Sequence, residues 1–134
     1  MNVVEETKKS MKQINLVFPN QLFEDSPLFE IDAPFYIVEE YLFFKQYPFH
    51  KQKIAFHRAS MKRYANFLKE TKKVEVFYVE ALEDIADIRL LLPYLGQEGI
   101  EKINYIDPVD NWLEARLFKA ALENGIKQEE WTSP

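Results

Sequence analysis

The sequence predicts an α/β protein: a three-layer α/β/α sandwich on a Rossmann-like, doubly wound parallel sheet of five strands. Short apolar segments alternate along the chain with longer segments whose apolar residues recur at helical spacing. Most of the short segments are apolar throughout, which is typical of strands covered on both faces. With 134 residues, of which 47% are hydrophobic and 29% charged, the chain has the length and composition of one domain with its own core.

Five short segments are predicted to form the strands. The first, INLVF at residues 14–18, is followed by the Pro19-Asn20 pair, which favours a turn. The last is the least apolar of the five. The segments after the first are residues 35–39 (FYIVE), 74–79 (VEVFYV), 103–106 (INYI) and 126–131 (IKQEEW).

Three longer segments between the strands are predicted to be helical. Residues 50–69 and residues 82–95 each place apolar side chains three or four positions apart. A third helix is expected after Asp110, whose carboxylate suits the N-cap position, and it is expected to end at Gly125. Residues 21–32 are expected to form at most a short helix.

The composition argues against several classes of function. A net charge of −5 gives no general attraction to phosphate backbones, so DNA or RNA binding by this chain alone is disfavoured. The absence of cysteine excludes disulfides, thiolate metal sites and a cysteine-ligated cluster. None of the three glycines belongs to a GxGxxG or P-loop pattern, so a nicotinamide dinucleotide site is not expected.

The two ends of the chain are expected to differ from the domain between them. Residues 1–12 (MNVVEETKKSMK) are predicted to be a polar leader and are too polar for a signal peptide. No apolar run approaches the roughly 20 residues of a membrane span, and a cytoplasmic location without membrane contact is expected. The domain is expected over residues 13–134, and its polar last residues are expected to lead towards a linker and more protein.

No catalytic or metal-ligating residue is predicted. His50 and His57 lie seven positions apart on the predicted helix, about 10 Å, which is too far to share one ion, and no HExxH motif is present. Glu39 and Glu40 are adjacent at a strand end, so their side chains should diverge rather than act as an acid/base pair. Taken alone, His57 is most simply interpreted as a partly buried, hydrogen-bonded histidine. Arg58 is most simply interpreted as part of a solvated helix face.

A ligand site is expected outside the carboxyl ends of the strands, where open parallel sheets bind ligands. Polar residues follow these predicted ends, including Asn20, Gln21 and Glu39. The next helix should direct His50 and Lys53 towards this crevice from its first turn, where free N–H groups favour an anion or a carbonyl.

Several motifs resemble the N-terminal α/β domain of the photolyase-related proteins, in the bacterial cryptochrome/photolyase branch that includes the iron–sulfur (6-4) photolyases. They are LVFPNQL after the first strand, YIVEE at the end of the second, and the helix-start sequence FHKQKIAFHRASMKRYANFL. The DPVDNW turn at residues 107–112 also fits the family pattern. The resemblance covers residues 14–134, and the helix-start motif is its most specific part.

The resemblance implies that the complete protein repairs ultraviolet lesions in DNA by light-driven electron transfer from FAD. The FAD site, the DNA-binding surface and a possible iron–sulfur cluster would belong to a helical C-terminal domain absent from this sequence. That domain would be the partner of this one, and damaged DNA would be bound only through it. The N-terminal domain would hold an antenna chromophore, of the ribityl-lumazine type in the best-matching branch.

By motif position, the resemblance implies a set of candidate chromophore contacts at the crevice. His57 is included because it replaces a small aliphatic residue that lines the antenna pocket in the family. Two alternatives stay open: a non-catalytic structural domain whose crevice is empty, and an independent nucleotide-binding α/β protein. The sequence leaves the oligomeric state open. The candidate cofactor-binding residues are Asn20, Gln21, Glu39, His50, Lys53 and His57.

Overall fold

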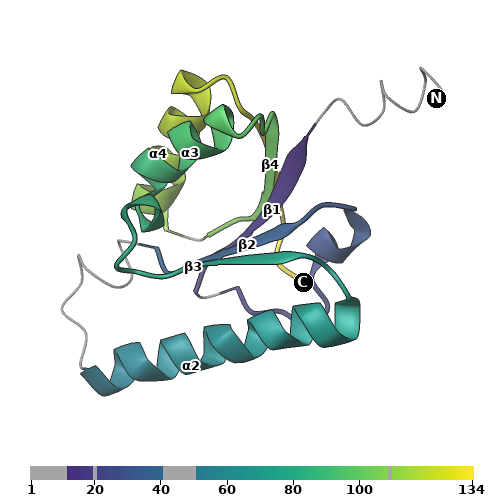
Figure 1. The fold of residues 1–134 in the computed structure, drawn as a ribbon. Helices are drawn as coiled ribbons and strands as arrows, with labels where there is room; N and C mark the ends of the chain where they lie inside the picture. Colours follow the sequence, from purple (N-terminus) through teal and green to yellow (C-terminus); the bar gives the residue numbers. More distant parts are fainter. Residues whose placement is uncertain (1–11, 20, 41–50, 109) are drawn as a thin grey trace.

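The fold is a five-stranded parallel sheet between helical layers, which confirms the predicted α/β class (Figure 1). The computed structural model describes residues 12–19, 21–40, 51–108 and 110–134, with the backbone alone for residues 51–57. The strand order is β3-β2-β1-β4-β5, the doubly wound arrangement. The strands are β1 (Gln13–Val17), β2 (Phe35–Val38), β3 (Val76–Val79), β4 (Lys102–Ile106) and β5 (Lys127–Trp131).

Helices cover both faces of this sheet. Helix α2 (Lys51–Phe67) lies on one face and continues into a π-helical turn, η3 (Leu68–Lys72). Helices α3 (Ile88–Gln97) and α4 (Asn111–Glu123) lie on the other face (Figure 1). The described residues of the β1–β2 connection form one short helical element, the 3-10 turn η1 (Pro27–Glu30), as the sequence predicts. None of the helices in the described ranges is long and apolar enough to cross a bilayer.

The segment between β3 and β4 departs most from the predicted boundaries. The sequence predicts a helix over residues 82–95, whereas Asp84–Ala86 forms a 3-10 turn, η4, and α3 begins only at Ile88. Asp87 explains the later start because its carboxylate accepts a hydrogen bond from the amide of Arg89 at 2.9 Å, which makes it the N-cap. Capping chemistry thus outweighs apolar periodicity in setting where this helix begins.

The limits of α4 agree with those predicted. Asp110 Oδ1 accepts hydrogen bonds from the amides of Trp112 (3.0 Å) and Leu113 (3.1 Å), as an N-cap residue should. Gly125 follows the C-cap residue Asn124 with a φ of 65°, in the left-handed region that glycine adopts without a steric cost.

Two apolar cores occupy the spaces between the sheet and its helices. The core under α3 and α4 joins Ile14 to Leu92 and Leu117, and all three are fully buried. The core under α2 joins Ile37 to Met61, both also fully buried. Because these cores use the strand faces, the polar groups able to meet a ligand are concentrated at the strand ends.

Candidate functional site

Two buried glutamates follow β2 at the carboxyl edge of the sheet. Neither Glu39 nor Glu40 is exposed to solvent. The two side chains leave on opposite faces, Glu39 towards α2 and Glu40 towards α3, because successive residues of an extended chain alternate. The predicted divergence of the two side chains is therefore confirmed. Each carboxylate has its own set of protein donors.

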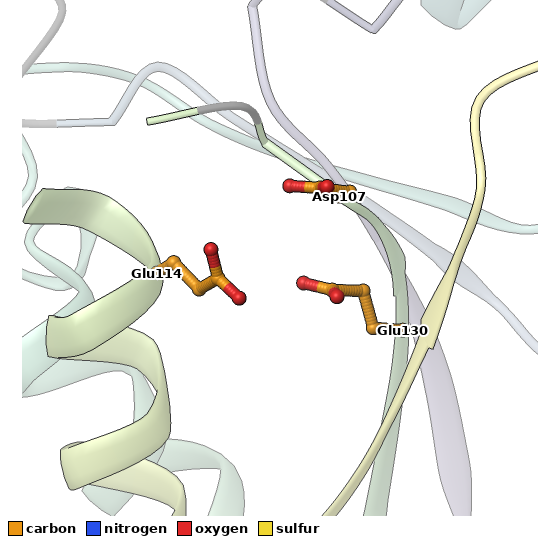
Figure 2. Close-up of side chains that lie close together, drawn as sticks. All are labelled: Asp107, Glu114 and Glu130. Atoms are coloured by element: carbon orange, nitrogen blue, oxygen red, sulfur yellow. The ribbon is translucent and has the colours of Figure 1, made fainter. Parts of the chain in front are cut away.

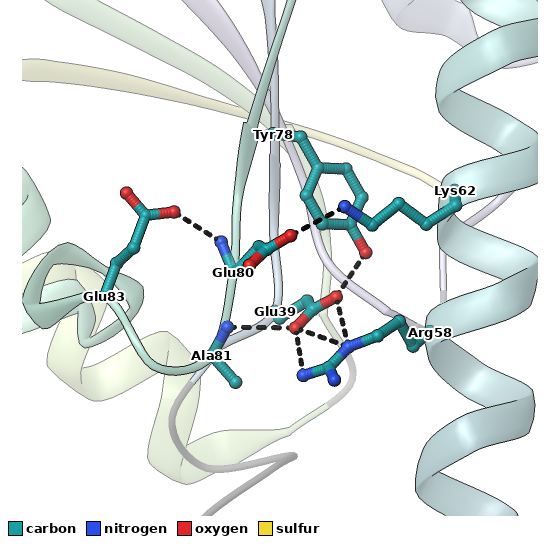
Figure 3. Close-up of polar contacts among 7 residues, drawn as sticks. All are labelled: Glu39, Arg58, Lys62, Tyr78, Glu80, Ala81 and Glu83. Carbon is teal, nitrogen blue, oxygen red and sulfur yellow. Dashed lines mark hydrogen bonds and ion pairs between the residues drawn. The ribbon is translucent and has the colours of Figure 1, made fainter.

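Glu39 is held by donors from three elements (Figure 3). The Nε of Arg58, on α2, lies 3.1 and 3.0 Å from the two carboxylate oxygens, and its Nη2 lies 2.8 Å from Oε1. The amide of Ala81, after β3, donates to Oε1 at 2.9 Å. The hydroxyl of Tyr78, on β3, donates to Oε2. The bidentate arginine contact is the strong form of such a pair.

These donors decide the protonation state of the carboxyl group. Burial would raise the pKa of Glu39, but the hydrogen bonds from Arg58, Tyr78 and Ala81 outweigh burial and hold that pKa below its ordinary value. Burial, together with the adjacent carboxylate, raises the pKa of the Tyr78 hydroxyl, which stays a donor. Glu39 is therefore an ionised, fully desolvated carboxylate at neutral pH.

A second ion pair lies beside Glu39 and Arg58. Lys62, one helical turn after Arg58, lies 2.9 Å from a carboxylate oxygen of Glu80, and its Nζ lies 3.9 Å from the centroid of the Tyr78 ring. Arg58 and Lys62 are each nearly half exposed, so the expected solvated helix face exists. Both side chains nevertheless have specific partners, and Arg58 is a site residue that sequence reasoning missed. The sequence pattern that could have revealed Arg58 is its spacing of four residues from Lys62. On one face of a helix, this spacing lets the two cations meet the two strand-end glutamates.

Glu40 stabilises the opposite side of the same edge. Its Oε1 accepts a hydrogen bond of 3.3 Å from the amide of Ile88, the first residue of α3. A carboxylate at a helix N-terminus is favourable because the free amides there carry partial positive charge. Glu40 thus attaches α3 to the end of β2.

Gln21 lies at the switch point of the sheet, where the ends of β1 and β4 meet. It is 3% exposed, and its Nε2 donates to the carbonyl oxygens of Ile106 (2.6 Å) and Asp107 (3.1 Å). Its Oε1 accepts from the amide of Phe18 at 3.4 Å. The side chain therefore ties the two strand ends together, and its contact with a chromophore stays a prediction.

The other predicted contacts fall at the limits of the described structure. Asn20 and His50 lie outside the described residues. Lys53 and His57 lie in the first two turns of α2, where the structure describes the backbone alone. The structure therefore brings Glu39 and Gln21 to one edge of the sheet, and the roles of the other four residues stay predictions.

A third acidic group lies away from Glu39, between α4 and the edge strand β5 (Figure 2). Carboxylate oxygens of Asp107, Glu114 and Glu130 lie within 4.8 Å of one another, beside a pocket of about 520 Å³ whose floor includes Tyr105. Burial and repulsion from Glu114 and Asp107 raise the pKa of Glu130. Burial and the charges of Glu130, Glu114 and Asp107 raise the pKa of Tyr105 to about 12. Oxygen ligands of this kind suit Mg²⁺ or Ca²⁺, but exposed acidic groups often lie this close without an ion.

Comparison with known proteins identifies the family. A family model described as deoxyribodipyrimidine photo-lyase-related protein matches residues 15–134. An uncharacterized protein of Acanthamoeba polyphaga mimivirus is 36% identical over 115 residues, which cover 80% of this chain and 57% of that protein. The chain thus spans little more than half the length of this relative. Since the family model covers nearly all of the described fold, the chain belongs to the deoxyribodipyrimidine photo-lyase-related protein family.

Proposed function

We propose that this chain binds a light-harvesting cofactor of the ribityl-lumazine type and docks a separate FAD-binding domain of a photolyase-related flavoprotein. It has no catalytic activity of its own in this proposal. The bound cofactor supplies light absorption, while the residues of this chain bind and orient it. Repair of DNA, and any contact with damaged DNA, belong to the FAD-binding domain.

The buried, ionised carboxylate of Glu39 at the carboxyl edge of the sheet carries the proposal. Desolvating a charge is costly, and strand ends of open parallel sheets are the usual place for ligands. The Arg58 side chain that faces Glu39 is 44% exposed, so it reaches solvent at the same edge. A guanidinium held by a buried carboxylate is a preorganised donor for a carbonyl or anionic group of a flat heterocycle.

The donor set also limits how Glu39 acts. Its two oxygens already accept hydrogen bonds from Arg58, Tyr78 and the Ala81 amide. A ribityl hydroxyl that donates to this carboxylate must share it with Tyr78 or displace that hydroxyl. Glu39 therefore contributes mainly by fixing the position of Arg58, which presents its guanidinium to the cofactor.

A fluorescence titration of a ribityl-lumazine with this chain tests the cofactor part. The wild-type chain is expected to bind with saturable quenching, and Arg58→Met is expected to weaken binding at least tenfold. Glu129→Gln is the matched control, because Glu129 also forms a carboxylate–cation pair, with Lys102 at 2.7 Å, but away from the proposed site. Circular dichroism establishes that each variant is folded.

Three outcomes separate the proposal from its alternatives. No saturable lumazine binding would leave a structural domain with an empty crevice. Saturable binding of ATP or AMP instead of the lumazine would favour an independent nucleotide-binding protein. Equal affinity of wild type, Arg58→Met and Glu129→Gln for the lumazine would show that binding occurs away from Glu39.

A further inference from the structure

Helix α4 presents an apolar stripe to solvent. Trp112 is 69% exposed, Phe118 57% and Leu122 71%, while Leu113 and Leu117 on the inner face are fully buried. With Ala115, the exposed residues follow one another at intervals of three, three and four positions. That spacing places them along one side of the helix, so α4 is apolar on two faces instead of one.

The flank of this stripe that faces β5 is acidic. Glu114 lies one helical turn before Phe118, and both line the 520 Å³ pocket together with Glu130 of β5. Figure 2 shows the carboxylates of Glu114, Glu130 and Asp107 directed towards one another from α4, β5 and the end of β4. Within the part of the chain that the structure describes, the ion pairs do not include Glu114 or Glu130.

The shape of this region is that of a groove. Among the described residues, strand β5 is the edge of the sheet and pairs with β4 alone. The outer flank of α4 forms one wall, through Glu114, Ala115 and Phe118, and Gln128 with Glu130 forms the other. On the far flank of the stripe lie Arg116 and the exposed Lys119. The groove is therefore lined by Ala115 and Phe118 together with polar groups, and each wall carries a carboxylate.

These charges discriminate between possible occupants. The two carboxylates favour an occupant that brings a cation over one that brings only apolar or acidic groups. A lysine or arginine beside an apolar helix face would meet both features at once. Exposed apolar stripes rimmed by polar groups are typical of protein-binding surfaces.

We propose that the α4–β5 groove docks an amphipathic helix of a partner domain, with apolar side chains on Phe118 and Leu122 and a basic side chain between Glu114 and Glu130. The inference deepens the docking part of the proposed function and rests on it, because the partner would be the FAD-binding domain. It uses none of the residues around Glu39. Cofactor binding and docking can therefore fail separately.

A partner that brings a cation would stabilise the ionised carboxylates. Burial, together with repulsion from Glu114 and Asp107, raises the pKa of Glu130. An incoming ammonium or guanidinium would relieve this repulsion, so binding should lower that pKa and weaken as salt rises. An apolar partner without a cation would leave the repulsion in place.

Peptide binding to the folded 134-residue chain tests the inference. The probe is a synthetic amphipathic helix with leucines along one face and one arginine beside them, and its twin carries glutamate in place of that arginine. By fluorescence anisotropy, the arginine peptide is expected to bind at least tenfold more tightly than its twin. The double variant Glu114→Gln, Glu130→Gln should abolish this preference, and Phe118→Ser should weaken both peptides.

The control replaces an equally apolar residue elsewhere. Leu82 is 85% exposed and lies before η4, so Leu82→Ser should leave both affinities unchanged. All these variants change exposed or half-exposed side chains, and circular dichroism checks that they fold. The inference is overturned if the two peptides bind equally, if neither binds at about 1 mM, or if Leu82→Ser weakens binding as much as Phe118→Ser. Lumazine binding by the same samples reports separately on the cofactor site.

Discussion

Replacing Arg58 by methionine removes the cation that faces the buried Glu39 carboxylate while keeping a side chain of similar length. The lost contacts are three N–O distances between 2.8 and 3.1 Å. Removing one partner of a fully buried ion pair typically costs 3–5 kcal/mol, roughly. The Arg58 side chain is 44% exposed, so solvent already screens the pair and about 2 kcal/mol is expected here.

The pair is best measured by a double-mutant cycle. Glu39→Gln keeps an oxygen for the Ala81 amide but loses the charge, so it should also cost about 2 kcal/mol. Once the carboxylate is neutral, Arg58→Met should remove only about 1 kcal/mol more instead of 2. The double variant should therefore lose about 3 kcal/mol rather than 4, which corresponds to a coupling energy of roughly 1 kcal/mol.

Urea unfolding at neutral pH, followed by far-ultraviolet circular dichroism and tryptophan fluorescence, measures these free energies of unfolding. A matched cycle on the Lys62–Glu80 pair, whose partners are both about half exposed, should give a coupling below about 0.5 kcal/mol. Additivity of Glu39→Gln and Arg58→Met within about 0.3 kcal/mol would refute the assignment of Glu39 and Arg58 as one structural unit.

Three further predictions concern single groups. The pKa of Glu39 in the folded protein is below its ordinary value of 4.5. The stability that the ionised carboxylate contributes is therefore fully present above pH 4.5 and is lost as the pH falls through the lower, folded-state pKa. Acid titration should accordingly destabilise the wild-type protein more than Glu39→Gln. Gln21→Ala should cost about 1–3 kcal/mol in urea, because it leaves the buried Ile106 carbonyl without its donor, and a smaller loss would contradict the bridging role. The raised pKa of Glu130 means that its ionised form opposes folding, so Glu130→Gln should stabilise the protein at pH 7 by about 0.5 kcal/mol, and this gain should disappear as the pH falls.

The fold could be predicted from sequence because its signals are local. An apolar run such as residues 103–106 is long enough for one buried strand and too short for an ordinary helix. Asp110 and Gly125 determine the limits of α4 through their own capping chemistry. The start of α3 was misjudged because apolar periodicity over residues 82–95 hid the capping role of Asp87.

The positions of candidate site residues could be predicted only where they depend on the local sequence, at or just after the end of one strand. The period of two along an extended chain sufficed to separate Glu39 from Glu40. The pairing of Arg58 with Glu39 joins residues 19 positions apart and depends on how α2 lies across the sheet. The cluster of Glu114, Glu130 and Asp107 draws on three elements, so no spacing in the sequence reveals it.

The two acidic regions of this domain have opposite electrostatic states, and that difference indicates their roles. Glu39 has its full set of donors and a lowered pKa, so a new hydrogen bond to its carboxylate must replace an existing one. Burial and repulsion from Glu114 and Asp107 raise the pKa of Glu130, so an incoming cation would be attracted to these carboxylates. Recognition of a cofactor near Glu39 should therefore act through the half-exposed Arg58, whereas recognition of a partner at the α4–β5 groove should act on the carboxylates directly. Arg58→Met should accordingly affect lumazine binding alone, and the double variant Glu114→Gln, Glu130→Gln should affect peptide binding alone.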